Sequence, residues 1–166
     1  GNGGKKGQGG VRLAERTSIT RAARPPEFIG DRLLRVTLEL LGRAKVVTFF
    51  VAYAPTETQT ASNKHAFCTT LDRAVEEVSR HEQLFVLVDV NARTGKRRKG
   101  GVESKKNKIF GAHGRDTLNH NGELLMFFAK THDLAIVNTF FSTPKGGVSH
   151  TFNGQGKKCI NYILTK

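Results

Sequence analysis

An aspartate and an asparagine two residues apart follow a short apolar run in the middle of this chain. Leu84 to Val88 is uninterrupted in its apolar character, and Asp89 and Asn91 come directly after it. A short run of this kind predicts a strand buried on both faces, and layered α/β folds form their sites at the carboxyl ends of such strands. In a continuing strand, residues i and i+2 project to one side, so the carboxylate and the amide would face one crevice.

The same spacing also has a purely structural interpretation. Asp and Asn are frequent in turns, so Asp89 also fits the first residue of an Asx turn before Ala92 to Gly95. Tyr53 poses a similar choice, because it ends an apolar run just ahead of Pro55. Its hydroxyl is placed either to donate a hydrogen bond to a phosphate or to stay in water above a buried ring. The residues alone leave both alternatives open.

The elements that must position these residues alternate between strands and helices. Residues 33–41 and 46–54 are apolar runs joined by a short turn, which predicts a hairpin whose first strand has one solvated face. Apolar residues recur at spacings of three and four from Ser62 to Ser79, which predicts a surface helix. The second strand, this helix and the strand at 84–88 then form a crossover unit, as in α/β folds.

The second half of the chain continues in the same way. Asn121 to Lys130 predicts a short helix with Asn121 as its N-cap. Three further strands are predicted at 134–140, 148–152 and 160–164, with 153–158 as a connection between the last two. A chain of 166 residues with this pattern is sized for one α/β domain.

The charge of the chain favours a polyanionic partner. It holds 27 Lys and Arg residues against 14 Asp and Glu residues, a formal charge of +13, which attracts nucleic acid. A basic loop begins right after the Asp89 and Asn91 pair, where we expect it to hold a nucleic-acid backbone, although such loops are often only solvated. The residues concerned are Lys96, Arg97, Arg98 and Lys99. No apolar run reaches the roughly 20 residues of a membrane-spanning helix, so no membrane partner is expected.

The cysteines and the first residues bear on the compartment. Cys68 and Cys159 lack the spacing of metal ligands, and no secretory signal is visible at the start of the sequence. A reducing, intracellular setting is therefore the simpler interpretation. With nucleic acid as the expected partner, we expect a nuclear location. Nothing in the sequence predicts an oligomeric state.

A set of motifs in one order carries a family resemblance. They are YAP at 53–55, DVNARTG at 89–95, GRDTLNHNGELL at 114–125, VNTFFSTPKGG at 137–147, SHTF at 149–152 and INYIL at 160–164. In this order the chain, from about residue 9 to 166, resembles the endonuclease domain of non-LTR (LINE-type) retrotransposons and their domesticated relatives, within the endonuclease/exonuclease/phosphatase superfamily. The resemblance implies a two-layered α/β sandwich that nicks DNA by Mg²⁺-dependent phosphodiester hydrolysis, with no small-molecule cofactor.

The resemblance also implies a role for individual residues. Asp89 would orient or deprotonate the attacking water, and Asn91 would donate to the scissile phosphate. Tyr53 matches a tyrosine that contacts this phosphate, and Thr151 matches a hydroxyl that touches the same group. Asn161 stands where the family has an aspartate that orients the active-site histidine. Phosphodiester hydrolysis needs such a base, such neutral donors and a divalent cation against the developing charge.

The departures from the family pattern temper the expected activity. An N-terminal strand with a glutamate ligand for Mg²⁺ and a C-terminal S-D-H motif are not present in this sequence, and Arg12 replaces an expected glycine. Cys159 and Cys68 stand where arginine and tryptophan are usual. We therefore expect 1–166 to be a single partial domain, truncated at both ends, that is inactive or weakly active. The alternatives are a non-catalytic nucleic-acid-binding or interaction fragment, and a hydrolase of small phosphate esters or inositol phosphates, which the charge of +13 disfavours.

Overall fold

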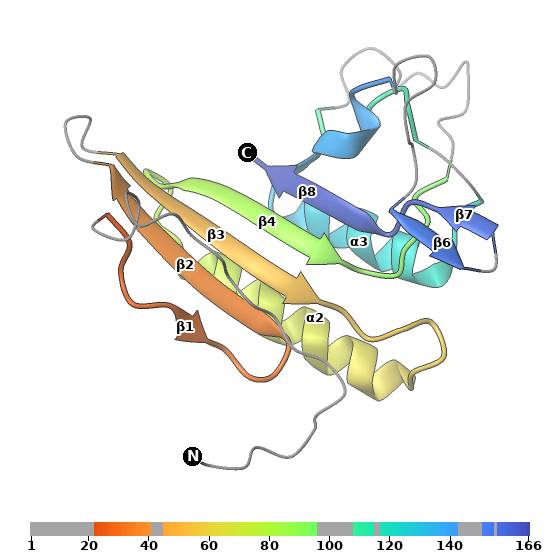
Figure 1. The fold of residues 1–166 in the computed structure, drawn as a ribbon, viewed down its shortest axis with the longest axis horizontal. Coiled ribbons are helices and arrows are strands. Elements are labelled where there is room, and N and C mark those ends of the chain that lie inside the picture. The colour runs from red at the N-terminus through yellow and green to blue at the C-terminus, as the bar shows by residue number, and fades with distance from the viewer. Residues whose placement is uncertain (1–21, 41–44, 96–107, 115–116, 143–150, 155) are drawn as a thin grey trace.

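A computed structural model of the protein describes residues 22–40, 45–95, 108–114, 117–142, 151–154 and 156–166. One layer is a six-stranded mixed sheet with the strand order β1-β2-β3-β4-β8-β5 (Figure 1). Its strands are β1 Glu27–Phe28, β2 Leu33–Leu40, β3 Lys45–Tyr53, β4 Gln83–Asp89, β5 Ala135–Ile136 and β8 Asn161–Thr165. Two helices, α2 Ala61–Glu76 and α3 His120–Thr131, lie against one face of this sheet. The predicted two-layered α/β sandwich is therefore confirmed.

The crossover unit of β3, α2 and β4 forms the middle of the sheet. β2 and β3 pair antiparallel as the predicted hairpin, and β4 returns parallel to β3. Thr60 begins α2 as its N-cap, because its hydroxyl accepts the backbone N–H of Asn63. Leu71 and Val75 of α2 are buried against the sheet. No helix in the described parts of the chain is long and apolar enough to cross a membrane.

The N-terminus of α3 differs from the prediction by two residues. Asn119, and not Asn121, is the N-cap, and its side-chain oxygen accepts the backbone N–H of Gly122 at 3.0 Å. Asn121 lies inside the helix and is 5% exposed. Gly122 is required here, because a Cβ atom at this position would clash with the carbonyl oxygen of Arg93. The first turn of α3 is thus pressed directly onto the loop after β4.

The two faces of the sheet are buried to different degrees. On the helix side, Leu84, Val86 and Val88 of β4 are almost fully buried. On the opposite side Phe85 is only half-buried, and it stacks on Phe49 with ring centroids 5.2 Å apart. The prediction that β4 is buried on both faces therefore holds fully for one face only.

The solvated face predicted for β2 is solvated only in part. On this face, opposite Leu34 and Val36, Leu33 and Thr37 are buried and Glu39 is exposed. Leu33 belongs to the core between the sheet and the helices, so the helix layer covers this end of β2.

Two predictions in the C-terminal part also need correction. The strand expected at 134–140 is cut short: β5 ends at Ile136, and a 3₁₀ turn, η2 Val137–Thr139, follows. The hydroxyl of Thr139 donates to the carbonyl of Ile136 at 2.7 Å and so closes this turn. The expected connection at 153–158 is itself paired, as strands β6 Phe152–Gly154 and β7 Gly156–Lys158. Residues 148–150 of the predicted strand lie outside the described residues.

A small cavity remains between the two helices and the sheet. It has a volume of about 40 Å³ and an almost entirely apolar lining, to which Cys68 and Leu71 of α2 and Phe128 of α3 contribute. Burial, and then the charge of Asp72, raise the pKa of the Cys68 thiol, so this cysteine behaves as a small apolar residue. The core is therefore underpacked at Cys68.

Filling this cavity is expected to stabilise the protein. Core cavities cost about 24 cal/mol per Å³, so Cys68→Leu should gain up to about 1 kcal/mol and raise the melting temperature by about 2–4 °C. Cys68→Ala, the matched control, enlarges the cavity and should lower the melting temperature. Differential scanning calorimetry of the three proteins measures both effects. A lower melting temperature for Cys68→Leu than for Cys68→Ala would contradict this account.

Candidate functional site

Three of the predicted site residues form one row across neighbouring strands. Parallel pairing of β3 with β4 places Tyr53 beside Asp89, and antiparallel pairing of β4 with β8 places Asp89 beside Asn161. Residues directly opposite each other in a sheet share a face, so the three side chains emerge on one side at one edge. Thr151 joins them, because its hydroxyl oxygen accepts the backbone N–H groups of Ile160 and Asn161 at 3.0 and 3.2 Å. The convergence predicted for Tyr53, Asp89 and Thr151 thus agrees with the structure, while the roles of all these residues stay predictions.

Asp89 and Asn91 are related by a turn and not by a continuing strand. The backbone N–H of Asn91 donates to Oδ1 of Asp89 at 3.2 Å, and Asn91 has a φ of +50°. Asparagine tolerates this left-handed conformation better than most residues do. The Asx turn is therefore the correct interpretation of the spacing, and the alternation expected from a strand was wrong. The turn still leaves the Asp89 carboxylate in the row.

The Asp89 carboxyl group sits in a balance between burial and hydrogen bonding. Burial raises its pKa, while the N–H of Asn91 and the side chain of Asn161 lower it. Asn161 is thus directly coupled to Asp89 and takes the position at which the family resemblance implies a second carboxylate. The amide stabilises the charged form of Asp89, whereas a second carboxylate would oppose it.

The side-chain amide of Asn91 contains one of two buried polar atoms that lack a hydrogen-bond partner among the described residues, the other being Oδ1 of Asn121. In Asn91 this atom is the donor Nδ2. A buried donor without a partner costs roughly 1–3 kcal/mol, so such groups are uncommon outside functional sites. An oxygen of a bound molecule would satisfy it.

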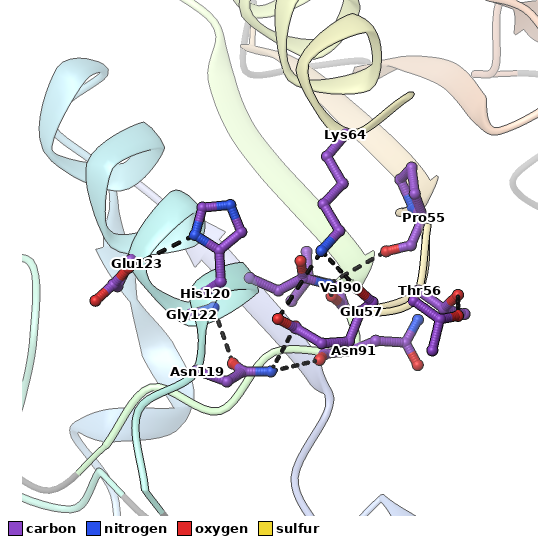
Figure 2. A network of polar contacts seen from close by, with 12 residues as sticks. Pro55, Thr56, Glu57, Lys64, Val90, Asn91, Asn119, His120, Gly122 and Glu123 are labelled. Atoms are coloured by element: carbon purple, nitrogen blue, oxygen red, sulfur yellow. Dashed lines mark hydrogen bonds and ion pairs between the residues drawn. The ribbon is translucent and has the colours of Figure 1, made fainter. Parts of the chain in front are cut away.

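Asn119 connects the turn at Asn91 to two other elements (Figure 2). Its Nδ2 donates to the carbonyl of Asn91 at 3.2 Å and to Oε2 of Glu57 at 2.9 Å. Its Oδ1 accepts the N–H of Arg93 at 2.7 Å, in addition to the capping bond to Gly122. One side chain thereby fixes the start of α3, the loop after β4 and the loop between β3 and α2.

Two further buried side chains support the same loops. Lys64 is 7% exposed, and its Nζ donates to the carbonyl of Glu57 at 2.8 Å (Figure 2). The Nδ2 of Asn121 donates to the carbonyls of Pro55 and Val90 at 3.2 and 2.9 Å. Side chains of α2 and α3 therefore hold the loops that carry the site through hydrogen bonds to the backbone carbonyl groups of these loops.

Sequence reasoning missed several residues that position the site. Asn119 was overlooked in favour of Asn121, although both are asparagines, a type preferred at the N-cap. Nothing local marks Lys64 or Glu57. Arg32 was also missed, and its guanidinium lies over the ring of Tyr53 at 5.5 Å from the centroid.

The described residues of this edge offer a single carboxylate to a magnesium ion. Asp89 is the one carboxylate in the row, and its described neighbours are the amides of Asn91 and Asn161. No group of three His, Cys, Asp or Glu side chains suited to a metal ion occurs in the described part of the chain. Magnesium is held in proteins by one or two carboxylates together with water and substrate phosphates. Asp89 would therefore be the protein ligand of such an ion among the described residues.

The structure does not test the predicted basic contacts. Lys96, Arg97, Arg98 and Lys99 lie outside the described residues. Their predicted role in binding a nucleic-acid backbone stays a prediction.

Comparison with known proteins places the fold. No family model matches the chain. Craniofacial development protein 2 of Bos taurus is 25% identical over 160 residues, which cover 95% of this chain and 25% of that protein, so the chain spans about a quarter of its relative. The crystal structure of AP endonuclease LMAP from Leishmania major superposes with a TM-score of 0.50 at 9% identity, covering 82% of this chain and 46% of that one.

The structural likeness shows that this chain and the AP endonuclease share a fold. Membership of the endonuclease/exonuclease/phosphatase superfamily and the LINE-type origin stay predictions.

Replacing the Asp89 carboxylate should stabilise the folded protein at neutral pH. Because the folded-state pKa of Asp89 is raised, its contribution to stability is present below the unfolded pKa of about 3.9 and lost as pH rises through the folded pKa. Asp89→Asn removes this loss and keeps the acceptor for the N–H of Asn91. The half-exposed carboxylate is screened by water, so the gain at pH 7 stays below about 1 kcal/mol. Thermal melts from pH 3 to 8 should show that the stability gained by Asp89→Asn over the wild type decreases toward acid pH. A gain that stays constant with pH would contradict this prediction.

Asn119 can be tested without removing its capping role. Asn119→Asp keeps the N-cap acceptor but loses both donors and places a carboxylate beside Glu57, so we expect a loss of about 1 kcal/mol or more. Adding Glu57→Gln should recover part of this loss, because the glutamine amide can donate to the new carboxylate. Urea unfolding of both single variants and the double variant gives their coupling energy. Strict additivity would show that the two side chains do not interact.

Proposed function

We propose that the protein binds DNA through its phosphate backbone, with one phosphodiester group at the edge formed by Tyr53, Asn91 and Asn161. The observation that carries this proposal is the buried, unpartnered amide of Asn91 beside the row of Tyr53, Asp89 and Asn161. Neutral N–H and O–H donors match the oxygens of a phosphodiester. The formal charge of +13 adds an attraction to the whole polyanion that is independent of its sequence.

On this proposal the chain descends from a LINE-type DNA endonuclease and acts in the nucleus. The order of the motifs from residue 53 to 164 supports the descent. The nuclease-like fold shared with the AP endonuclease supports DNA as the ligand.

Hydrolysis of the bound strand is the second candidate function. Burial raises the pKa of Asp89, which makes its carboxylate a better acceptor for a proton of an attacking water. Expulsion of the leaving oxygen requires a proton donor or a positive charge close to it. Among the described residues no histidine belongs to the row, Asn161 carries no charge, and the Arg32 guanidinium lies over the Tyr53 ring, outside the row. We therefore propose that this chain binds DNA more effectively than it cleaves it.

Binding and cleavage can be separated with one substrate. Supercoiled plasmid incubated with the protein should show a gel shift that weakens steeply between 50 and 200 mM salt. Nicking should stay near background in Mg²⁺ and in EDTA. Nicking in Mg²⁺ that Asp89→Asn abolishes would instead establish the second candidate function.

Asn91→Gly tests the phosphate contact itself. Glycine accepts the left-handed backbone, so the variant loses only the amide. The dissociation constant for DNA should rise about tenfold, whereas thermal stability should stay equal or increase, because an unpartnered buried donor is removed. Unchanged affinity would overturn the proposed phosphate site.

A further inference from the structure

An open groove runs beside the candidate phosphate edge. It lies between the turn that joins β1 to β2 and the first turns of α2, and its volume is about 450 Å³. Its lining is mixed in character and includes Ile29, Asp31, Arg32, Gln59, Asn63 and Phe67. A groove of this size, with an aromatic ring, two amides and a guanidinium, has the dimensions and donors of a small-ligand site.

Arg32 joins this groove to the row of site residues. The backbone N–H of Tyr53 donates to the carbonyl of Arg32 at 2.9 Å, and Nη1 of Arg32 reaches the carbonyl of Tyr53 at 3.5 Å. The guanidinium also lies over the Tyr53 ring. Tyr53 therefore belongs to the phosphate edge on one side and orients Arg32 on the other.

Arg32 and the nearby Arg35 differ in whether their guanidinium groups form ion pairs with carboxylates. Arg35 lies over the Phe50 ring at 5.9 Å and pairs with Glu77 at 3.4 Å and Glu27 at 3.7 Å. Among the described residues Arg32 forms no ion pair with a carboxylate. Arg32 keeps its charge and most of its five N–H groups for a ligand, and a guanidinium matches phosphate in shape and charge.

We propose that this groove is a second nucleic-acid subsite, in which Arg32 binds the phosphate that neighbours the one at the Tyr53, Asn91 and Asn161 edge. The attached nucleotide lies along Phe67, between the amides of Gln59 and Asn63. The Asp31 carboxylate at the rim opposes the phosphate and limits the affinity. This inference rests on the proposed function, since it needs a strand held at the edge.

The test compares two arginines of equal charge, Arg32 just before β2 and Arg35 within it. Binding of a fluorescein-labelled single-stranded DNA oligonucleotide is followed by anisotropy at several salt concentrations. Arg32→Gln should raise the dissociation constant about tenfold and reduce the slope of log affinity against log salt by about one. Arg35→Gln removes the same charge away from the groove and should change the dissociation constant less than about twofold.

A second pair of variants tests whether binding becomes tighter, so its result does not depend on the loss of a contact. Asp31→Asn should tighten binding by about twofold to fivefold, because it removes the opposing charge. Glu76→Gln removes an exposed carboxylate of α2 outside the groove and serves as its control. This pair decides the matter if Arg32→Gln melts at a much lower temperature than the wild type.

The outcomes separate the two proposals. If the wild type fails to bind the oligonucleotide, the proposed function itself falls. If the wild type binds and Asn91→Gly weakens it, but the two arginine variants behave alike and Asp31→Asn matches Glu76→Gln, the edge site stands and the groove subsite is overturned.

Discussion

The parallel pairing of β3 with β4 is the constraint on which the rest of the structure depends. It is created by the α2 crossover, and its register places Tyr53 opposite Asp89. Because side chains alternate along a strand, a shift of one residue would turn Asp89 toward the helices and Tyr53 away from it. The core fixes this register: Leu84, Val86 and Val88 must face α2 and α3, which leaves Asp89 on the opposite face. Packing on one side of the sheet therefore decides chemistry on the other.

The site also requires that the loops after β3 and β4 have a fixed conformation. Side-chain amides fix them. Asn119 and Asn121 bond to backbone groups of Asn91, Arg93, Val90 and Pro55. A neutral amide offers both donors and acceptors, so it can join two carbonyls or a carbonyl and an N–H without adding charge. Within the row itself Asp89 is the one charged residue, and the Arg32 guanidinium lies beside the row over the Tyr53 ring. Recognition of an anion here would rest on oriented dipoles, with the wider positive field of the protein bringing the ligand close.

Sequence patterns predicted the elements whose signals are local, and failed where distant contacts decide. The apolar runs at 33–41, 46–54 and 84–88 located three strands to within a residue or two, since burial requires such runs. The sequence analysis took Asn121 as the cap of α3, whereas Asn119 caps it and also bonds to Arg93 and Asn91 in the loop after β4. The strand at 134–140 ended early because Thr139 bonds back to Ile136. Tyr53 and Asp89 stood at strand ends and were predictable, whereas Arg32, Glu57 and Lys64 act through partners brought near by the fold.

Thr151 gives this edge a directionality. A hydroxyl has two lone pairs and one hydrogen, and the Thr151 oxygen already accepts the N–H groups of Ile160 and Asn161. What it can still offer is its hydrogen. The unpartnered Nδ2 of Asn91 is likewise able only to give. At these two side chains an incoming group rich in hydrogen-bond acceptors is therefore matched, as the phosphodiester of the proposed function would be. The Asp89 carboxylate between Tyr53 and Asn161 is the acceptor of the same edge, so donors and an acceptor lie in separate places along it.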